Sequence, residues 1–478
     1  MANGGNFGLG GDALGVMEQS IAQARARIQC GELSPVALVQ AALERIEAAD
    51  GELNVCRTVD AEGAVAAAEA VEDAARRGDP LGPLADIPVA LKDNIDVAGL
   101  PMTAGTRFYD GGLPARDAPV WERMRRAGAV LVGKLSMSEW AIGGTGQNVH
   151  YGPCRNPWDP ERVTGGSSSG SGAGVAAGMV MAALGTDTAG SVRIPAALCG
   201  VSGLRPSAGR VSNRGSIPVA WSFDAIGPMA RRAEDVAEVL NVIAGYDRDD
   251  PCSVDAPAED YVAALARGAS GLRVGVLSDD WLVDADGAVI SAVREAAATL
   301  ARLGATIEEV SLPGRAEAFV LTAEMVLAEA AWVHRERLAS TPEIYAPDVL
   351  ARLQRGASVT GPQYSWGRQR QRIWRRRALE ALAGHDLLLA PAAPIPAPRI
   401  DESDPLEMTA RLTPTISAWV LTGTPVMSVP AGFCDGLPIG VQLVGKPFAE
   451  ATVLAAAHAF QQATDWHLQR PPHLSAAA

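Results

Sequence analysis

Serine and threonine hydroxyls gather in one stretch of the chain, where reactive serine chemistry is conceivable. Residues 165–172 read GGSSSGSG and residues 186–193 read TDTAGSVR. The first segment contains a GxSxG pattern centred on Ser168, which in a nucleophile elbow presents a reactive serine on a sharp strand-to-helix turn. That turn needs a strand directly before it and a histidine base, but the preceding RNPWDPERVTG is typical of a loop. None of the six histidines lies in a suitable context, so the pattern disfavours a nucleophile elbow.

Two further patterns suggest phosphate or nucleic-acid binding. Gly128 to Lys134 nearly fits the phosphate loop GxxxxGK[ST], but Leu135 replaces the hydroxyl residue and the intervening residues are apolar and strand-like. Residues 368–377 read RQRQRIWRRR, which is compatible with a nucleic-acid face or with a solvated helix face. Because the net charge is −14 and no second run of this kind occurs, we favour the solvated face and predict no nucleic-acid partner.

The longest chemically suggestive block runs from Asn156 to Pro195 and reads NPWDPERVTGGSSSGSGAGVAAGMVMAALGTDTAGSVRIP. It closely resembles the amidase signature enzymes, which are serine hydrolases with a Ser, cis-Ser, Lys triad in place of histidine. The resemblance continues upstream in LKDNIDVAGLPMTAG and downstream in GLRPSAGRVS, FDAIGPMARRAEDV and GLPIGVQLVGKPFAEATVL. It covers the chain from about residue 32 to about residue 470.

The resemblance assigns roles to individual residues. It implies that Lys92 in LKDN is the base, that Ser167 is the cis-serine and that Ser191 is the nucleophile. It also implies an oxyanion hole made by the backbone N–H groups of Thr188, Ala189, Gly190 and Ser191. Most members have glycine where this chain has Ala189, and a β-carbon there would restrict a left-handed turn.

The same resemblance indicates which residues surround the reacting groups. It places a substrate-binding loop at Ile142, Gly143, Gly144 and Thr145. Asp187 and Arg193 are expected to support the nucleophile turn through hydrogen bonds between their charged groups and its backbone. Four tryptophans flank these segments and suggest an apolar cleft: Trp121, Trp140, Trp158 and Trp221.

A buried, neutral lysine can remove the proton that makes a serine hydroxyl a poor nucleophile. We therefore interpret the chain as an amidase-type hydrolase of carbon–nitrogen bonds other than peptide bonds, with an acyl-enzyme on Ser191 and water as second substrate. Carbamate (urethane) and aryl ester bonds fit the same chemistry. The alternative is the glutamine-hydrolysing subunit of a tRNA-dependent amidotransferase. A noncatalytic binding protein is disfavoured, because Lys92, Ser167 and Ser191 are all retained.

Hydrophobic periodicity predicts the elements that position these residues. Apolar runs at 87–91 and 129–132, with a helical stretch between them, indicate parallel strands. We predict a single large α/β domain with a mixed, mostly parallel central sheet between helical layers. Residues 1–80 would form an N-terminal helical layer of that domain, and residues 81–478 the catalytic core. A variable helical region that determines specificity is expected around residues 231–385.

Composition limits the cellular setting and the partners. The N-terminus lacks the features of a signal peptide, and the apolar run at 172–184 is too short to span a membrane. Six scattered cysteines without a CxxC pair fit a reducing cytoplasm. No HExxH motif or Cys/His cluster indicates a metal, so we predict no metal and no cofactor. The expected partners are a small amide or carbamate substrate and water, without membrane, in a monomer or homodimer.

Overall fold

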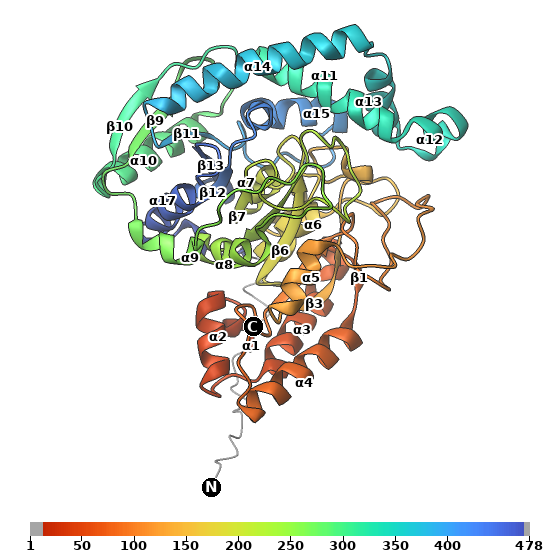
Figure 1. The fold of residues 1–478 in the computed structure, drawn as a ribbon, viewed down its shortest axis with the longest axis vertical. Helices are drawn as coiled ribbons and strands as arrows, with labels where there is room; N and C mark the ends of the chain where they lie inside the picture. Colours follow the sequence, from red (N-terminus) through yellow and green to blue (C-terminus); the bar gives the residue numbers. More distant parts are fainter. Residues whose placement is uncertain (1–12, 473–478) are drawn as a thin grey trace.

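An eleven-stranded mixed sheet runs through residues 13–472, the part of the chain that the computed structural model describes (Figure 1). Its spatial strand order is β1-β3-β2-β6-β8-β7-β12-β13-β11-β9-β10. The strands are β1 (Cys56–Val59), β2 (Pro88–Lys92), β3 (Val130–Leu135), β6 (Ala182–Asp187), β7 (Ser202–Arg205), β8 (Ala225–Ala230), β9 (Arg273–Leu277), β10 (Thr306–Val310), β11 (Leu387–Pro391), β12 (Val426–Cys434) and β13 (Leu437–Gly445). A separate two-stranded sheet joins β4 (Arg155–Asn156) to β5 (Asp159–Val163).

The pairing of neighbouring strands divides the large sheet into blocks. Strands β3, β2 and β6 are parallel at one end, and β11, β9 and β10 are parallel at the other. The strands between these blocks pair antiparallel, as does the edge strand β1 with β3. All residues of β2, β3 and β6 are buried, as expected for parallel strands that are covered on both faces. The predicted α/β class and the mixed sheet are confirmed.

The N-terminal segment is mainly helical and lies at one end of the molecule (Figure 1). Its helices are α1 (Ala13–Val16), α2 (Ile21–Gln29), α3 (Pro35–Leu53) and α4 (Ala61–Arg77). The Ser34 hydroxyl accepts a hydrogen bond from the Ala37 N–H at the start of α3, and Pro35 occupies the first turn. The predicted helical layer differs in one respect. Strand β1 interrupts the helices and joins the sheet, which a four-residue strand between two long helical patterns did not reveal.

The remaining helices cover the sheet and build a layer above its carboxyl-end loops. They are α5 (Pro119–Arg126), α6 (Ser169–Ala176), α7 (Arg193–Cys199), α8 (Ala233–Ile243), α9 (Tyr261–Ala264), α10 (Gly287–Arg302), α11 (Arg315–Val333), α12 (Arg335–Ser340), α13 (Pro347–Ala357), α14 (Gly361–Ala383), α15 (Pro405–Leu412), α16 (Pro414–Ser417) and α17 (Glu450–Gln462). Helices α11, α13 and α14 pack on one another, with the long α14 outermost (Figure 1). The region 231–385 therefore forms a helical layer together with strands β9 and β10.

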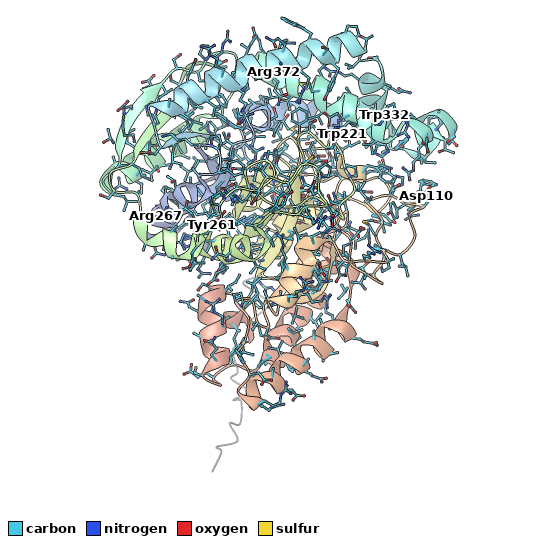
Figure 2. The ribbon with its side chains drawn as sticks, viewed as in Figure 1. Asp110, Trp221, Tyr261, Arg267, Trp332 and Arg372 are labelled. Carbon is cyan, nitrogen blue, oxygen red and sulfur yellow. The ribbon has the colours of Figure 1, made fainter. Side chains whose placement is uncertain are left out.

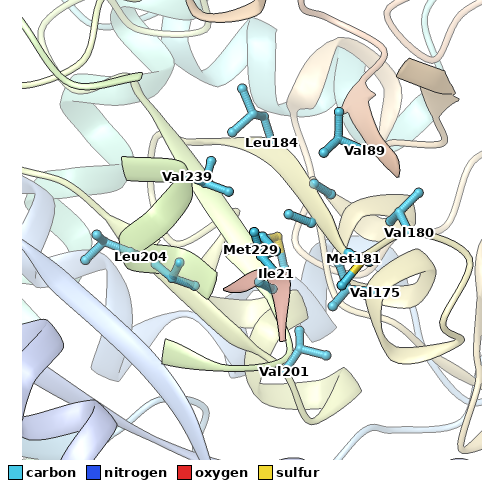
Figure 3. Close-up of a cluster of buried hydrophobic side chains, with 14 of the residues drawn as sticks. Ile21, Val89, Val175, Val180, Met181, Leu184, Val201, Leu204, Met229 and Val239 are labelled. Atoms are coloured by element: carbon cyan, nitrogen blue, oxygen red, sulfur yellow. The ribbon is translucent and has the colours of Figure 1, made fainter. Parts of the chain in front are cut away.

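The interior depends on close contact between small residues and the sheet (Figure 3). Side chains of β2, β6, β8 and α6 meet in the main cluster, among them Val89, Leu184, Met229 and Val175. Helix α6 is fully buried, and a β-carbon on its Gly170 would lie 2.5 Å from the Val55 carbonyl oxygen. Only glycine permits that approach, which fixes α6 and the serine loop before it against β3 and β6.

Across residues 13–472, no helix is both long enough and apolar enough to cross a membrane.

Candidate active site

Lys92 is the last residue of β2, where the parallel strands end beside β6. Its side chain is fully buried. The amine Nζ lies 2.7 Å from the Ser167 Oγ and 2.8 Å from the Thr186 Oγ1. Ser167 belongs to the loop before α6 and is also fully buried, and the Gly166–Ser167 peptide bond is cis. The fold thus brings two of the three predicted triad residues, 75 positions apart in sequence, into direct contact.

The environment of Lys92 favours the neutral amine. Burial lowers its pKa to about 7, although the carboxylates of Asp187 and Asp224 act in the opposite direction. The groups in contact with Nζ are hydroxyls and a carbonyl, none of which carries a charge. A large fraction of the Lys92 amines can therefore accept a proton near neutral pH.

Ser191 differs from the two buried residues because it is half-buried and lines a cavity. Its carbonyl oxygen accepts a hydrogen bond from the Ser168 N–H at 3.2 Å, which joins the Ser191 turn to the serine loop. Within residues 13–472, the Ser191 hydroxyl has no hydrogen-bond partner. It is therefore free to meet a molecule that enters the cavity.

Ser168 is held in a structural position. Its side chain is fully buried, and its hydroxyl donates to the Thr186 carbonyl at 3.2 Å and accepts from the Thr186 N–H at 3.3 Å. Both bonds connect the serine loop to strand β6. This geometry agrees with the sequence argument against a nucleophile elbow, because the Ser168 hydroxyl has no open side from which to attack a carbonyl.

The turn at residues 188–191 presents unpaired backbone donors. The Gly190 N–H donates to the Asp187 carboxylate at 2.9 Å, so one of the four predicted oxyanion donors is already engaged. No described residue accepts a hydrogen bond from the N–H groups of Thr188, Ala189 or Ser191. The left-handed residue of the turn is Gly190, with φ of 120°, whereas Ala189 does not have a positive φ. The β-carbon of Ala189 is therefore tolerated without backbone strain.

A buried ion cluster supports that turn. Asp187 receives two hydrogen bonds from Arg193, at 2.9 and 3.0 Å, and one from the Val192 N–H at 3.2 Å. Arg205 contacts the same carboxylate at 3.3 Å, and Arg193 also donates to the Ile416 carbonyl at 2.7 Å. Burial alone would raise the pKa of Asp187, but the two guanidinium groups hold it well below its ordinary value. Arg193 is fully buried, and its described contacts are all with the protein.

We expect an Asp187→Asn substitution to lower the free energy of unfolding by about 3–5 kcal/mol, because it leaves Arg193 and Arg205 buried without a countercharge. Urea denaturation monitored by tryptophan fluorescence measures this change. The control is Glu380→Gln, which breaks an exposed pair between Glu380 and Arg376 and should leave the denaturation midpoint unchanged. Equal midpoints for both variants would contradict the supporting role of Asp187.

Asp224 is a further partner of the turn that the sequence did not reveal. It is fully buried, and it accepts hydrogen bonds from the Thr188 hydroxyl at 2.5 Å and from the Val219 N–H at 3.0 Å. Burial raises the pKa of Asp224 to about 6. It lies in the FDAIGPMARRAEDV segment that carries the family resemblance, so only that match could have drawn attention to it.

The cavity beside Ser191 has a volume of about 420 Å³. Three residues of the predicted substrate loop line it, namely Ile142, Gly143 and Gly144. Thr145 does not line it, which corrects the prediction for that residue. Its side chain is buried, and its hydroxyl accepts a hydrogen bond from the Gln147 N–H at 3.4 Å within the loop.

Helices distant in sequence supply the other walls of the cavity. They are α11, α13 and α15, which Figure 1 shows above the sheet, and the residues that they contribute are Phe319, Thr322, Ala323, Val326, Leu327, Ala351, Arg352, Arg355, Leu406, Thr409 and Ala410. The four flanking tryptophans are absent from the lining. Trp121, Trp140 and Trp158 are buried in the protein interior, and Trp221 is exposed (Figure 2).

Comparison with known proteins gives this geometry a family. The sequence profile of the Amidase family matches residues 37–454. This chain belongs to the amidase signature family. The family accounts for the contact between Lys92 and Ser167 and for the position of Ser191 on a neighbouring turn.

Individual family members resemble the chain over nearly its full length. A glutamyl-tRNA(Gln) amidotransferase subunit of Chloroflexus aggregans is 40% identical over 95% of this chain and 98% of its own. The structure of a protein from a vestigial complex that reveals the origins of an s-triazine catabolic enzyme is 35% identical, with a TM-score of 0.89 over 93% of this chain and 98% of its own. The peptide amidase of Stenotrophomonas maltophilia is 33% identical, with a TM-score of 0.83 over 96% and 99%.

These relatives contradict the expected partners. We predicted a small-molecule enzyme without nucleic acid, as a monomer or homodimer, whereas the amidotransferase relatives are named as one subunit of an enzyme of charged tRNA. The prediction relied on the net charge of the whole chain, which does not describe local surfaces. Helix α14 presents exposed arginines at its outer face, including Arg372 (Figure 2), and Arg375 and Arg377 beside it are exposed as well.

Proposed function

We propose that this chain hydrolyses a carboxamide through an acyl-enzyme on Ser191. The observation that carries the proposal is the buried contact of 2.7 Å between Lys92 Nζ and Ser167 Oγ, next to a serine that opens into a cavity. Burial supplies the lowered pKa that a lysine base requires. The amide nitrogen leaves as ammonia or an amine, and water then releases the acid.

The proton path follows from the order of these groups. Ser191 attacks the carbonyl carbon while its proton passes to Ser167, which gives its own proton to Lys92. The tetrahedral oxyanion accepts hydrogen bonds from the free N–H groups of the turn at 188–191, which are already in place before the reaction. Lys92 then returns the proton through Ser167 to the leaving nitrogen. Carbamates and aryl esters present the same carbonyl and fit the same sequence of steps.

A second candidate function is the glutamine-hydrolysing subunit of a tRNA-dependent amidotransferase. The 40% identity to the Chloroflexus aggregans amidotransferase subunit, over 95% of this chain, supports it. This identity favours a role within a complex more than a free-standing one. In that role, Ser191 would release ammonia from glutamine for transfer by other subunits. The chemistry at Ser191 is the same in both candidates.

We expect the purified chain to release ammonia or amine from at least one class of carboxamide, and a Ser191→Ala variant to release none. The assay compares primary amides, anilides, aryl carbamates and glutamine, each with and without the remaining subunits of a glutamyl-tRNA(Gln) amidotransferase. Glutamine hydrolysis that appears only with the added subunits would establish the second candidate. Equal rates for both forms of the protein on every substrate would refute amide hydrolysis at Ser191.

A further inference from the structure

The cavity beside Ser191 contains unequal numbers of positive and negative groups. Two arginines of α13, Arg352 and Arg355, belong to its lining, and no aspartate or glutamate among the described residues does. Asp348 lies outside the lining and holds Arg352 at 2.6 Å. Arg355 is exposed, and no described carboxylate lies within ion-pair distance of it. A positive charge that entered this cavity would therefore meet cations and no partner.

The polar side chains of the walls are already engaged with the protein. The hydroxyls of Thr322, Thr409 and Thr413 donate to backbone carbonyls four residues earlier, at 2.7 or 2.8 Å. Arg352 donates to the Thr409 hydroxyl at 2.9 Å and to the Ile142 carbonyl at 3.3 Å. These contacts join α13, α15 and the substrate loop into a preformed wall, and they leave few free acceptors for an ammonium group.

The rest of the wall is apolar and the space is large. Phe319, Val326, Leu327 and Leu406 face the cavity from α11 and α15. A volume of about 420 Å³ lies in the range of about 300–1,000 Å³ that is typical of pockets for drug-sized ligands. An aliphatic or aromatic acyl group fits this wall, because it buries apolar surface and needs no additional hydrogen-bond partners.

We infer that the cavity selects amides whose acyl group is apolar and carries no positive charge, and that it discriminates against free glutamine because of its α-ammonium group. This inference rests on the proposed hydrolysis at Ser191 and specifies its substrate class. A carboxylate on the acyl group is better tolerated than an ammonium, since Arg352 and Arg355 carry the opposite charge.

Three primary amides separate these contributions. Glutamine, 5-amino-5-oxopentanoate and 4-phenylbutanamide share the reacting carboxamide on a short methylene chain, and the second compound differs from glutamine only by loss of the ammonium group. We expect kcat/KM to be highest for 4-phenylbutanamide, intermediate for 5-amino-5-oxopentanoate and at least about 100-fold lower for glutamine than for 4-phenylbutanamide. A rate for glutamine equal to or above that of 5-amino-5-oxopentanoate would overturn the inference.

Substitutions at Ala323, a half-buried residue of α11 in the lining, test the electrostatic cause. We expect Ala323→Asp to raise the ratio of glutamine to 4-phenylbutanamide hydrolysis by about tenfold or more over the matched Ala323→Asn variant. An equal ratio in the two variants would show that charge does not determine selection. Labelling of Ser191 by a sulfonyl fluoride is measured in parallel. Labelling with a preference for glutamine refutes the inference alone, whereas the absence of both labelling and hydrolysis refutes the proposed function.

Discussion

Replacement of Ser191 by alanine is expected to lower kcat/KM for any amide substrate by at least about 10⁴-fold. The Ser191 hydroxyl faces the cavity, and no other group of the described site can form the acyl-enzyme in its place. Intact-mass spectrometry after treatment with a sulfonyl fluoride should show one adduct on the unaltered protein and none on the variant. Peptide mapping should place that adduct on Ser191.

The matched control for this substitution is Ser168→Ala. Ser168 lies in the same segment, but its hydroxyl is buried and bonded to the Thr186 backbone on both sides. We expect the variant to be less stable and still to be labelled at Ser191. An adduct on Ser168 of the unaltered protein would instead make Ser168 the nucleophile and contradict our assignment.

Replacement of Lys92 by alanine is expected to cost about 10²–10⁴-fold in amide hydrolysis, the contribution typical of a general base. In the unaltered enzyme, activity should rise as pH increases through about 7, because the base must be neutral and burial lowers its pKa to about 7. This rise in activity should be absent from the variant. The amide should lose more than an activated ester does, since an amine leaving group needs the proton that Lys92 returns and a phenolate does not.

Lys134 offers a control of similar burial on the neighbouring strand β3. It is fully buried and pairs with Asp93 at 3.2 Å, and within residues 13–472 it makes no hydrogen bond to Ser167 or Ser191. Lys134→Met should lower stability, because Asp93 then lacks its countercharge, and the pH profile should retain its rise near 7. A Lys92→Ala protein with an unaltered pH profile would show that another group accepts the proton.

The N-terminal helices illustrate how much of the fold could be predicted from local patterns. The start of α3 is encoded by adjacent residues, Ser34 as the cap and Pro35 in the first turn, and the structure has both. Strand β1 could not be predicted, because four residues carry little periodic signal and its pairing partner β3 lies about 75 positions away. The register of that pairing depends on contacts between distant segments.

The site itself divides in the same way. The triad residues were inferred because the residues around Lys92, Ser167 and Ser191 match a family pattern that is continuous in sequence. Thr145 was misplaced because a loop residue can lie beside a site and still turn inward. The walls from α11, α13 and α15 lack any motif, since apolar and small residues at helical spacing look the same in a pocket as in a core.

The sequence by itself determined the α/β class, the membership of the amidase signature family and the residues to consider for chemistry, because short segments with a constrained order of residue types encode each of them. Only the tertiary structure decided that Lys92 is buried against uncharged groups, that the Gly190 N–H is engaged by Asp187, and that the described lining of the cavity has arginines without carboxylates. The pKa of a lysine and the charge of a cavity are sums over neighbours from distant parts of the chain. Such sums exist only after those parts have packed together.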